Sequence, residues 1–197
     1  MNLSIAKYGD PILRVQGRRV QEVDDRIRDL AANMLETMHA ANGVGLAAQQ
    51  VGEALQLTVL DVLQTEDRPS TLRLDGREME LLTAMPLILL NPKITLDDET
   101  NIGTEGCLSF PEITAEIERS AAVNVRAETL AGDPIEIEAT GLLARVLQHE
   151  FDHLNGILFI DRMSSVAKAS LHSRLKRLRK ETVRGEKNAA RATQINL

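Results

Sequence analysis

The 197-residue sequence predicts an α+β fold, in which antiparallel β-sheets pack around a central helix. One helix precedes the sheets and an amphipathic helix follows them. The segments with strand character alternate and are rich in β-branched residues, and they lie between amphipathic segments. They lack the repeating strand–helix rhythm that is typical of doubly wound α/β folds. We expect residues 1–180 to form one domain and residues 181–197 to form a polar, flexible tail.

The composition excludes several classes of protein. A single cysteine cannot form an internal disulfide, so a secreted disulfide scaffold is excluded. No apolar run approaches the roughly 20 residues that a membrane span needs. The first residues lack the apolar stretch of a signal peptide. We therefore expect a soluble, cytoplasmic protein with no membrane partner.

The first helix is predicted over residues 24–43, with Asp24 as the N-cap and Gly43 as the C′ residue that ends it. Its apolar residues recur at the i, i+3, i+4 spacing of a helix with one buried face. These residues are Ile27, Leu30, Ala31, Met34, Leu35 and Met38.

The segments that follow have strand and loop character. Residues 56–63 alternate between the two faces, as a strand does. Residues 64–80 are polar and irregular, which indicates a loop or a hairpin excursion. Residues 81–92 contain strand-like runs that Pro86 interrupts, and we expect the strand to stop at the Asn91-Pro92 pair.

A hairpin and a second helix come next. Residues 122–127 and 134–139 alternate cleanly around a turn with the sequence A-G-D-P, which predicts an antiparallel hairpin. The second helix is predicted over residues 140–156, with Thr140 as the N-cap and Gly156 as the C′ residue.

The C-terminal segment is amphipathic and basic. One face is expected to carry Val166, Leu171, Leu175 and Leu178, and the apolar periodicity ends near residue 182. Residues 161–197 contain 10 Lys and Arg against 3 Asp and Glu, a balance of +7, whereas the rest of the chain has a balance of −13. A basic tail on an acidic body indicates an anionic partner such as nucleic acid or the ribosome, although charge alone favours a solvated helix with a fraying end.

The second helix contains the sequence Q-H-E-F-D-H. His149 and His153 are one turn apart on one helical face, so their rings can meet at one metal ion. Glu150 is rotated about 100° from His149 and can serve as a general base beside the metal. The face of the two histidines continues the apolar stripe of Leu142 and Val146. Alternatively, both histidines are buried and bonded to backbone or carboxylate groups.

Such a metal site needs a third ligand. His172, Glu181 and Glu186 follow the histidines, but no motif surrounds them. Cys107 is the better candidate, because a thiolate and two imidazoles form a zinc or iron site with a fourth position open for water. Taken alone, Cys107 would be interpreted as a small buried apolar residue.

Three motifs occur in a fixed order: G-V-G-L-A-A-Q-Q at residues 43–50, E-G-C-L-S at 105–109 and Q-H-E-F-D-H at 148–153. In sequence and spacing they resemble the three motifs of peptide deformylases, of the bacterial and organellar type with a C-terminal helix. A nucleotide cofactor is not expected, because the glycines follow a helix and no G-x-G-x-x-G is completed.

The resemblance implies a metal-dependent hydrolase. Cys107, His149 and His153 would bind one divalent metal, and Glu150 would transfer protons. The substrate would be the formyl group on the N-terminal methionine of a nascent peptide, and the products would be formate and a free amine. Fe(II) is expected in the cell, while zinc, nickel or cobalt are possible in purified protein, since the ligand set alone does not choose.

The resemblance also implies how the substrate is held. The Gln50 amide and the Leu108 N–H would face the developing oxyanion. The substrate backbone would add as a strand along Val44, Gly45 and Gly106.

Two further residues are expected to support this site. Ser109 and Asp152 would orient the loop and the metal ligands, although Asp152 can equally be a structural ion-pair residue. Gly103 stands where relatives often have a bulkier residue that lines the methionine pocket. Residues 64–86 look longer than in compact bacterial forms, and the sequence assigns them no role.

The C-terminal helix resembles the helix of bacterial forms that docks on the ribosome. Its basic residues include Arg174, Lys176, Arg177, Arg179 and Lys180. Two alternatives differ in class: a metallo-endopeptidase of the zincin type, and a catalytically silent module that binds the ribosome or a metal.

Overall fold

The computed structural model describes residues 1–65 and 68–195, with side chains to residue 185 outside the gap. A seven-stranded sheet has the order β1-β2-β5-β8-β9-β3-β4, and β6 and β7 form a separate two-stranded ribbon. Every strand pairing is antiparallel, so the predicted α+β class is confirmed. The strands are β1 (Gly45–Ala47), β2 (Leu57–Leu60), β3 (Leu72–Leu74), β4 (Arg77–Glu78), β5 (Leu87–Leu96), β6 (Thr100–Gly106), β7 (Thr114–Ser120), β8 (Ala122–Glu128) and β9 (Pro134–Thr140). The helices are α1 (Asp25–Ala40), α2 (Leu81–Ala84), α3 (Gly141–Leu154), α4 (Phe159–Arg162) and α5 (Ser165–Ile195), with 3₁₀ turns η1 (Pro11–Arg14) and η2 (Ala48–Val51).

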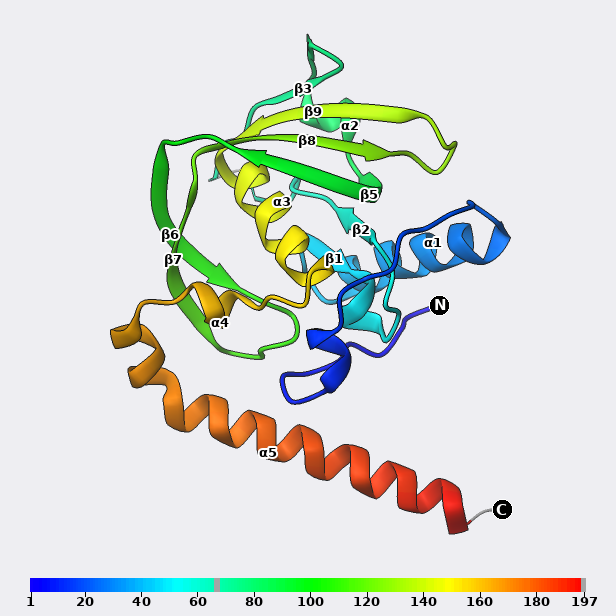
Figure 1. Ribbon diagram of the computed structural model, residues 1–197, viewed down its shortest axis with the longest axis vertical. Helices are drawn as coiled ribbons and strands as arrows, with labels where there is room; N and C mark the ends of the chain where they lie inside the picture. Colours follow the sequence, from blue (N-terminus) through cyan, green and yellow to red (C-terminus); the bar gives the residue numbers. More distant parts are fainter. Residues whose placement is uncertain (66–67, 196–197) are drawn as a thin grey trace.

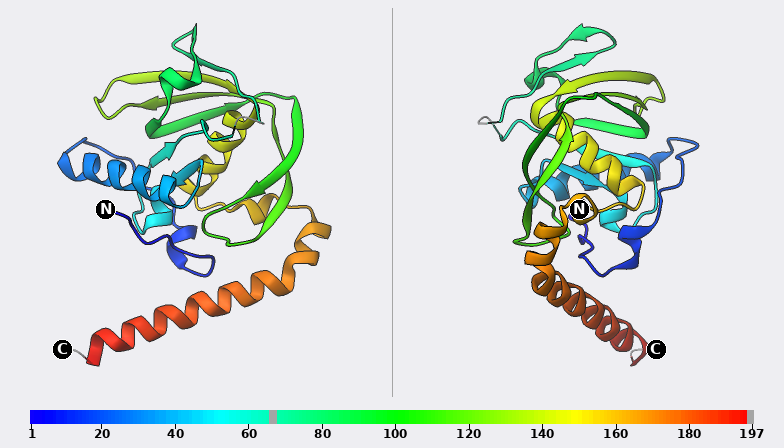
Figure 2. Two further views of the ribbon diagram at one scale, coloured as in Figure 1. Left: turned by 180° about the vertical axis from the view of Figure 1, so that it is seen from behind. Right: turned by 60° about the vertical axis from the view of Figure 1, so that its left-hand side comes forward.

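Helix α3 lies at the centre of the molecule. Figure 1 shows it between the large sheet and the curved β6–β7 ribbon, and both views in Figure 2 show the same arrangement. Because sheet and ribbon cover it from different sides, α3 is buried on nearly all its faces, and even its polar residues are enclosed. Its apolar residues pack against β2, β5, β8 and β9 in the main core, and include Leu142, Leu143, Ala144, Val146 and Leu147.

Helix α1 begins as predicted and ends differently. Asp24 is the N-cap, and its carboxylate accepts a hydrogen bond from the Ile27 N–H. At the C-terminus Asn42, with φ 53°, takes the left-handed C′ position that the sequence pattern gave to Gly43. The Gly43 N–H donates to the Met38 carbonyl at 2.9 Å, so Gly43 is the residue after C′ in a Schellman motif. Asparagine tolerates this conformation because its short polar side chain can bond locally.

Strand β5 contradicts the expected stop at Asn91-Pro92. The strand continues to Leu96 through a bulge between Leu90 and Lys93. Asn91 has φ 52°, and its side-chain amide exchanges two hydrogen bonds with the Val20 backbone, at 2.8 and 2.9 Å. The bulge lets Pro92 stay in the strand without a ladder N–H.

The segment before β5 also differs from the prediction. Residues 81–84 form the short helix α2 rather than a strand-like run, and Pro86 follows it. Strands β8 and β9 pair over residues 122–128 and 134–140, so the predicted hairpin is confirmed. Residues 64–80, predicted as a loop or a hairpin excursion, include the β3–β4 hairpin.

Helix α5 runs along one side of the body (Figure 1). Leu175 is buried, and Leu171 and Leu178 pack beside it in a core cluster with Leu13 and Phe110. Val166 was predicted on this face but is 78% exposed. It precedes Leu175 by nine residues, and at about 100° per residue this places the two side chains about 180° apart around the helix axis.

The loss of apolar periodicity near residue 182 does not end α5, which continues to Ile195. The flexibility predicted for residues 181–197 stays a prediction, because most of their side chains lie outside the described residues. Among the helices that the structure describes, none is long and apolar enough to cross a membrane.

The N-terminus of α3 is capped from a distant part of the chain. Thr140 occupies the N-cap position, but its side chain makes no capping bond and instead pairs with the Thr71 hydroxyl. The Leu143 N–H donates to the Ser70 hydroxyl at 2.9 Å, and the Leu142 N–H donates to the Pro69 carbonyl at 3.4 Å. Part of the excursion that had no assigned role therefore caps the central helix.

This long-range cap predicts the effect of a substitution. Ser70→Ala should lower the free energy of unfolding by about 1 kcal/mol, because one helical N–H loses its partner. Urea unfolding with circular-dichroism detection measures this. Thr140→Ala, at the position of the expected cap, should cost less. The opposite ranking of the two variants would show that Ser70 is not the cap.

Candidate metal centre and active-site pocket

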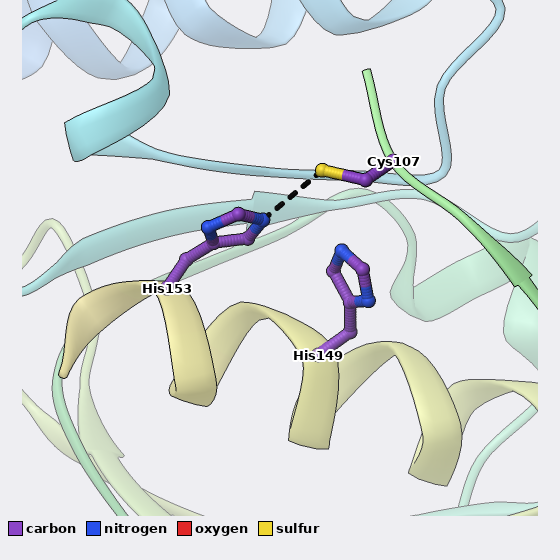
Figure 3. A group of neighbouring side chains, drawn as sticks. All are labelled: Cys107, His149 and His153. Carbon is purple, nitrogen blue, oxygen red and sulfur yellow. Dashed lines mark hydrogen bonds between the residues drawn. The ribbon is translucent and has the colours of Figure 1, made fainter. Parts of the chain in front are cut away.

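Three candidate ligands converge between α3 and the loop after β6. His149 and His153 stand one turn apart on α3, and their ring centroids are 5.0 Å apart. The Cys107 sulfur faces them and lies 3.2 Å from His153 Nε2 (Figure 3). One ligand atom from each residue falls within 4.8 Å of the others. The three residues, 46 and 42 positions apart in sequence, therefore form a compact donor set.

A buried carboxylate, Glu105, orients the first histidine. It accepts four hydrogen bonds: one from His149 Nδ1 at 2.9 Å, two from Arg119 and one from Arg145. Burial alone would raise the pKa of Glu105, but the hydrogen bonds from His149 and Arg119 outweigh it and lower the pKa to about 2. The ionised carboxylate fixes the His149 ring with Nε2 toward the cysteine, an arrangement that is typical of metal-bound histidines.

The charges around Glu105 form a continuous network. Arg119 of β7 also pairs with Asp152 at 2.5 Å, and Arg162 of α4 pairs with the other Asp152 oxygen at 2.6 Å. Arg145 of α3 donates to the Ile117 carbonyl at 2.8 Å. Among the described contacts, Asp152 reaches the histidines only through Arg119 and Glu105.

The two histidine rings are held in different electrostatic states. Burial lowers the pKa of both. For His149, Cys107 and Glu105 outweigh burial and raise the pKa well above its usual value. For His153, burial is reinforced by the neighbouring His149, and the pKa falls well below the usual value.

Glu150 is a buried carboxylate with one unpartnered oxygen. Its Oε2 has no hydrogen-bond partner among the described residues. Burial raises the pKa of Glu150 to about 7, against the opposing effect of His149. Gly45 of β1 faces it so closely that a Cβ at this position would collide with the carboxylate and with Val146. A larger residue at position 45 would therefore displace the Glu150 carboxylate.

Gln50 is fixed on the other side of the cysteine. Its Nε2 donates to the Ser109 hydroxyl at 3.2 Å and lies 3.5 Å from the Cys107 sulfur. Its Oε1 accepts a hydrogen bond from the Ala47 N–H at 2.9 Å. The amide group therefore presents its N–H side to the candidate metal centre, and Leu108 lies beside it.

A pocket of about 550 Å³ opens onto these groups. Its lining includes Gln50, Cys107, Leu108, His149 and Glu150, so these candidate residues share one cavity. Apolar walls come from Val44, Leu142, Val146, Phe110 and Ile113, and the remaining lining includes Lys7, Gly45, Arg68, Gly106 and Arg145. An apolar cavity with a few convergent polar groups is typical of an active site.

One edge of the pocket is an open strand. Asp61 directly follows β2, and its backbone N–H donates to the Val44 carbonyl at 3.0 Å. Residues 44 and 61, which extend the β1–β2 ladder by one pair, are therefore a hydrogen-bonded pair. By the alternation of antiparallel ladders, the N–H and C=O of the next residue, Gly45, point away from β2. Since β1 is the edge strand of the sheet, these groups are directed toward the pocket.

The structure brings the residues of the three motifs together around the pocket. Asp152 lies at the far end of the ion-pair network. His172 and Glu181, the other possible ligands that the structure describes, belong to α5 and do not line the pocket.

Glu105, Arg119 and Arg145 also belong to this site and were not predicted from the sequence. Arg145 lies four residues before His149 and hence on the same helical face, which was a usable signal. Glu105 precedes Cys107 by two residues, and Arg119 stands in no motif that indicates its partner.

The polypeptide deformylase family profile matches residues 2–169 of the chain. The chain belongs to the peptide deformylase family. It is 45% identical over 184 residues to the peptide deformylase of Opitutus terrae, covering 92% of this chain and 95% of that one. It is 41% identical over 177 residues to that of Acinetobacter baumannii, covering 89% and 91%.

Solved deformylases have the same fold. The Thermotoga maritima enzyme matches with a TM-score of 0.71 and 41% identity, covering 83% of this chain and 99% of that one. A plant peptide deformylase matches with a TM-score of 0.79 and 36% identity, covering 91% and 90%.

The comparisons confirm the predicted family and enzyme class. Peptide deformylases are metal-dependent hydrolases that remove the formyl group from nascent chains. Nothing in them supports the endopeptidase or the catalytically silent module.

The Glu105 network makes a quantitative prediction. Glu105→Gln should lower the free energy of unfolding by about 3–5 kcal/mol, because Arg119 and Arg145 are left buried without a full counter-charge. It should also weaken metal binding by about 10–100-fold, since His149 loses its charged partner. Urea unfolding and metal titration measure the two effects.

A matched control lies on the same ribbon. Glu118 of β7 is exposed and accepts a hydrogen bond from the Thr100 hydroxyl. Glu118→Gln should change neither quantity beyond about 0.5 kcal/mol. Equal effects of the two substitutions would refute the special role of Glu105.

Proposed function

We propose that this chain removes the formyl group from the N-terminal methionine of newly synthesised peptides, at the pocket that contains Cys107, His149 and His153. The observation that carries the proposal is the buried Glu150 carboxylate beside this donor set, in a cavity whose edge strand is free to pair. Amide hydrolysis needs an activated water, a polarised carbonyl and a protonated leaving group, and this site offers a group for each need.

The donor set fits a divalent metal. Two imidazoles and one thiolate within 4.8 Å of one another suit iron and zinc, with a fourth position free. The cation, when bound, would acidify a water and polarise the formyl carbonyl. We propose Fe(II) as the metal in the cell, with zinc, nickel or cobalt as substitutes in purified protein.

Glu150 would move the proton. One carboxylate oxygen would accept a proton from the attacking water and later deliver it to the amine nitrogen of the methionine. Its place beside the donor set puts the carboxylate within the same cavity as the attacking water and the leaving amine. Because its Oε2 has no other partner among the described residues, it is available for this role.

Gln50 and Leu108 would stabilise the oxyanion. The Gln50 amide is already oriented by Ser109 and by the Ala47 N–H, so little reorganisation is needed when negative charge develops. The Leu108 N–H would supply the second donor. Ser109 therefore acts through Gln50, and Asp152 through Arg119 and Glu105.

The peptide would bind as an added strand. The Gly45 backbone groups point away from β2, and Gly106 at the end of β6 lines the opposite wall of the pocket. The peptide would therefore run between Val44–Gly45 and Gly106, with its methionine side chain on the apolar wall.

The ribosome is the proposed site of action. Lys176, Arg177 and Lys180 are exposed on α5, where their charges can contact phosphates. Arg177 also forms an exposed ion pair with Glu181 at 3.8 Å. A cytoplasmic location follows from this role. We propose further that residues 1–180 form the catalytic domain and that residues 181–197 extend from it as a flexible tail.

One assay tests the function. The iron-loaded chain should release formate from formyl-Met-Ala-Ser, and Glu150→Ala should lower kcat by more than about 100-fold while the metal is retained. Cys107→Ser should lose most of the metal. An endopeptidase would instead cleave internal peptide bonds and would survive this substitution. Formate release that persists in Glu150→Ala would overturn the proposed proton transfer.

A charge-reduced helix tests the ribosome proposal. Replacing Lys176, Arg177 and Lys180 with Gln should weaken cosedimentation with ribosomes, and the salt dependence of binding should become shallower, because fewer phosphates are neutralised. Arg126→Gln, on the exposed face of β8, is the control. Binding that is unchanged at low salt would contradict the role of α5.

A further inference from the structure

The loop that supplies Cys107 and Leu108 is a tight turn. The Phe110 N–H donates to the Cys107 carbonyl at 2.8 Å, which closes a four-residue β-turn. Leu108 and Ser109 are the two central residues of this turn, so the peptide between them is its central peptide. A type II turn would require a positive φ at Ser109, and Ser109 is not among the described residues with positive φ.

The N-terminal segment donates hydrogen bonds to two carbonyl groups of the turn. Lys7 Nζ donates to the Leu108 carbonyl at 2.8 Å, and the Tyr8 N–H donates to the Ser109 carbonyl at 2.9 Å. The Ala6 N–H donates to the Gln50 carbonyl at 2.8 Å. Three consecutive residues thus join the turn to the 3₁₀ turn η2, the two segments that carry the proposed oxyanion donors.

We propose that Lys7 is a positioning residue for deformylation, which holds the central peptide of the Cys107–Phe110 turn and thereby the oxyanion donors on Leu108 and Gln50. This inference rests on the proposed function and on the roles proposed for those two donors.

The geometry of turns explains why this contact matters. Type I and type II turns differ by a rotation of the central peptide, which changes ψ of the second residue and φ of the third. Here these torsions belong to Leu108 and Ser109. They lie between the Leu108 N–H and the Ser109 hydroxyl that accepts the Gln50 hydrogen bond. A cation on the Leu108 carbonyl therefore fixes both donors relative to each other.

Lys7 is also placed to act on the site electrostatically. It is partly buried and lines the pocket. Burial lowers the pKa of Lys7, and the nearby Cys107 opposes this effect.

The substitution that tests Lys7 should leave the fold intact. Lys7→Met keeps the length of the side chain and removes the charge and the hydrogen bond. The Ala6 and Tyr8 backbone bonds remain, as does the stacking of Tyr8 on Phe110 with centroids 4.8 Å apart. Lys7→Arg keeps a donor and tests rescue. Lys93→Met, at an exposed lysine of β5, is the control.

The experiment compares these variants in the metal-loaded full chain. Lys7→Met should lower kcat by about tenfold or more, less than complete loss of an oxyanion donor, with KM within about threefold. Metal content and Tm should match wild type. Hydrogen exchange of residues 106–112 in the zinc-loaded protein should become faster. Lys7→Arg should recover part of kcat, and Lys93→Met should behave as wild type.

Other outcomes refute the inference. If wild type releases formate and Lys7→Met has the same kcat, or if only KM rises, Lys7 does not position the donors. The inference would also be refuted if Lys7→Met lost its metal, if Lys93→Met lost as much kcat, or if hydrogen exchange were unchanged. In each case the loss of kcat in Lys7→Met would not come from the position of the turn. If metal-loaded wild type releases no formate, the proposed function fails first and this inference fails with it.

Discussion

The charge balance at Glu105 is the constraint on which the rest of the site depends. This carboxylate stands on β6 and binds Arg119 of β7, Arg145 of α3 and His149. Two arginines can be buried at this depth only because an ionised partner is buried with them. The network therefore fixes β6 against α3. Since Cys107 follows Glu105 by two residues, the spacing of thiol and imidazoles is set by an ion-pair network rather than by apolar packing alone.

The site also contains groups that the fold leaves unsatisfied. Of the three buried side-chain atoms without a partner in the described chain, two are Glu150 Oε2 and His153 Nδ1. Buried polar atoms normally find partners, so such exceptions concentrate where function requires them. Gly45 adds a steric condition, since any larger residue would displace Glu150. The Glu150 carboxylate thus keeps an unpartnered oxygen at the wall of the pocket.

The sequence predicted the features that depend on local patterns. The periodicity within residues 24–43 and the spacing of His149 and His153 each report on one element, and the structure has α1 and α3 there. Features that arise from distant contacts were missed. The strand through Pro92 depends on Asn91 bonding to Val20, 71 residues away. Arg119 acquires its role only when β7 meets α3, and no periodicity encodes that meeting.

The cap on α3 has a consequence for how the chain folds. Ser70 and Leu143 are 73 positions apart, so the helix that carries both histidines gains its cap only after a long loop has closed. Ser70 is synthesised before α3, so the capping oxygen is already on the chain when the helix is made. His153 is the last of the three candidate donors in sequence, so the donor set cannot be complete before this residue has been made.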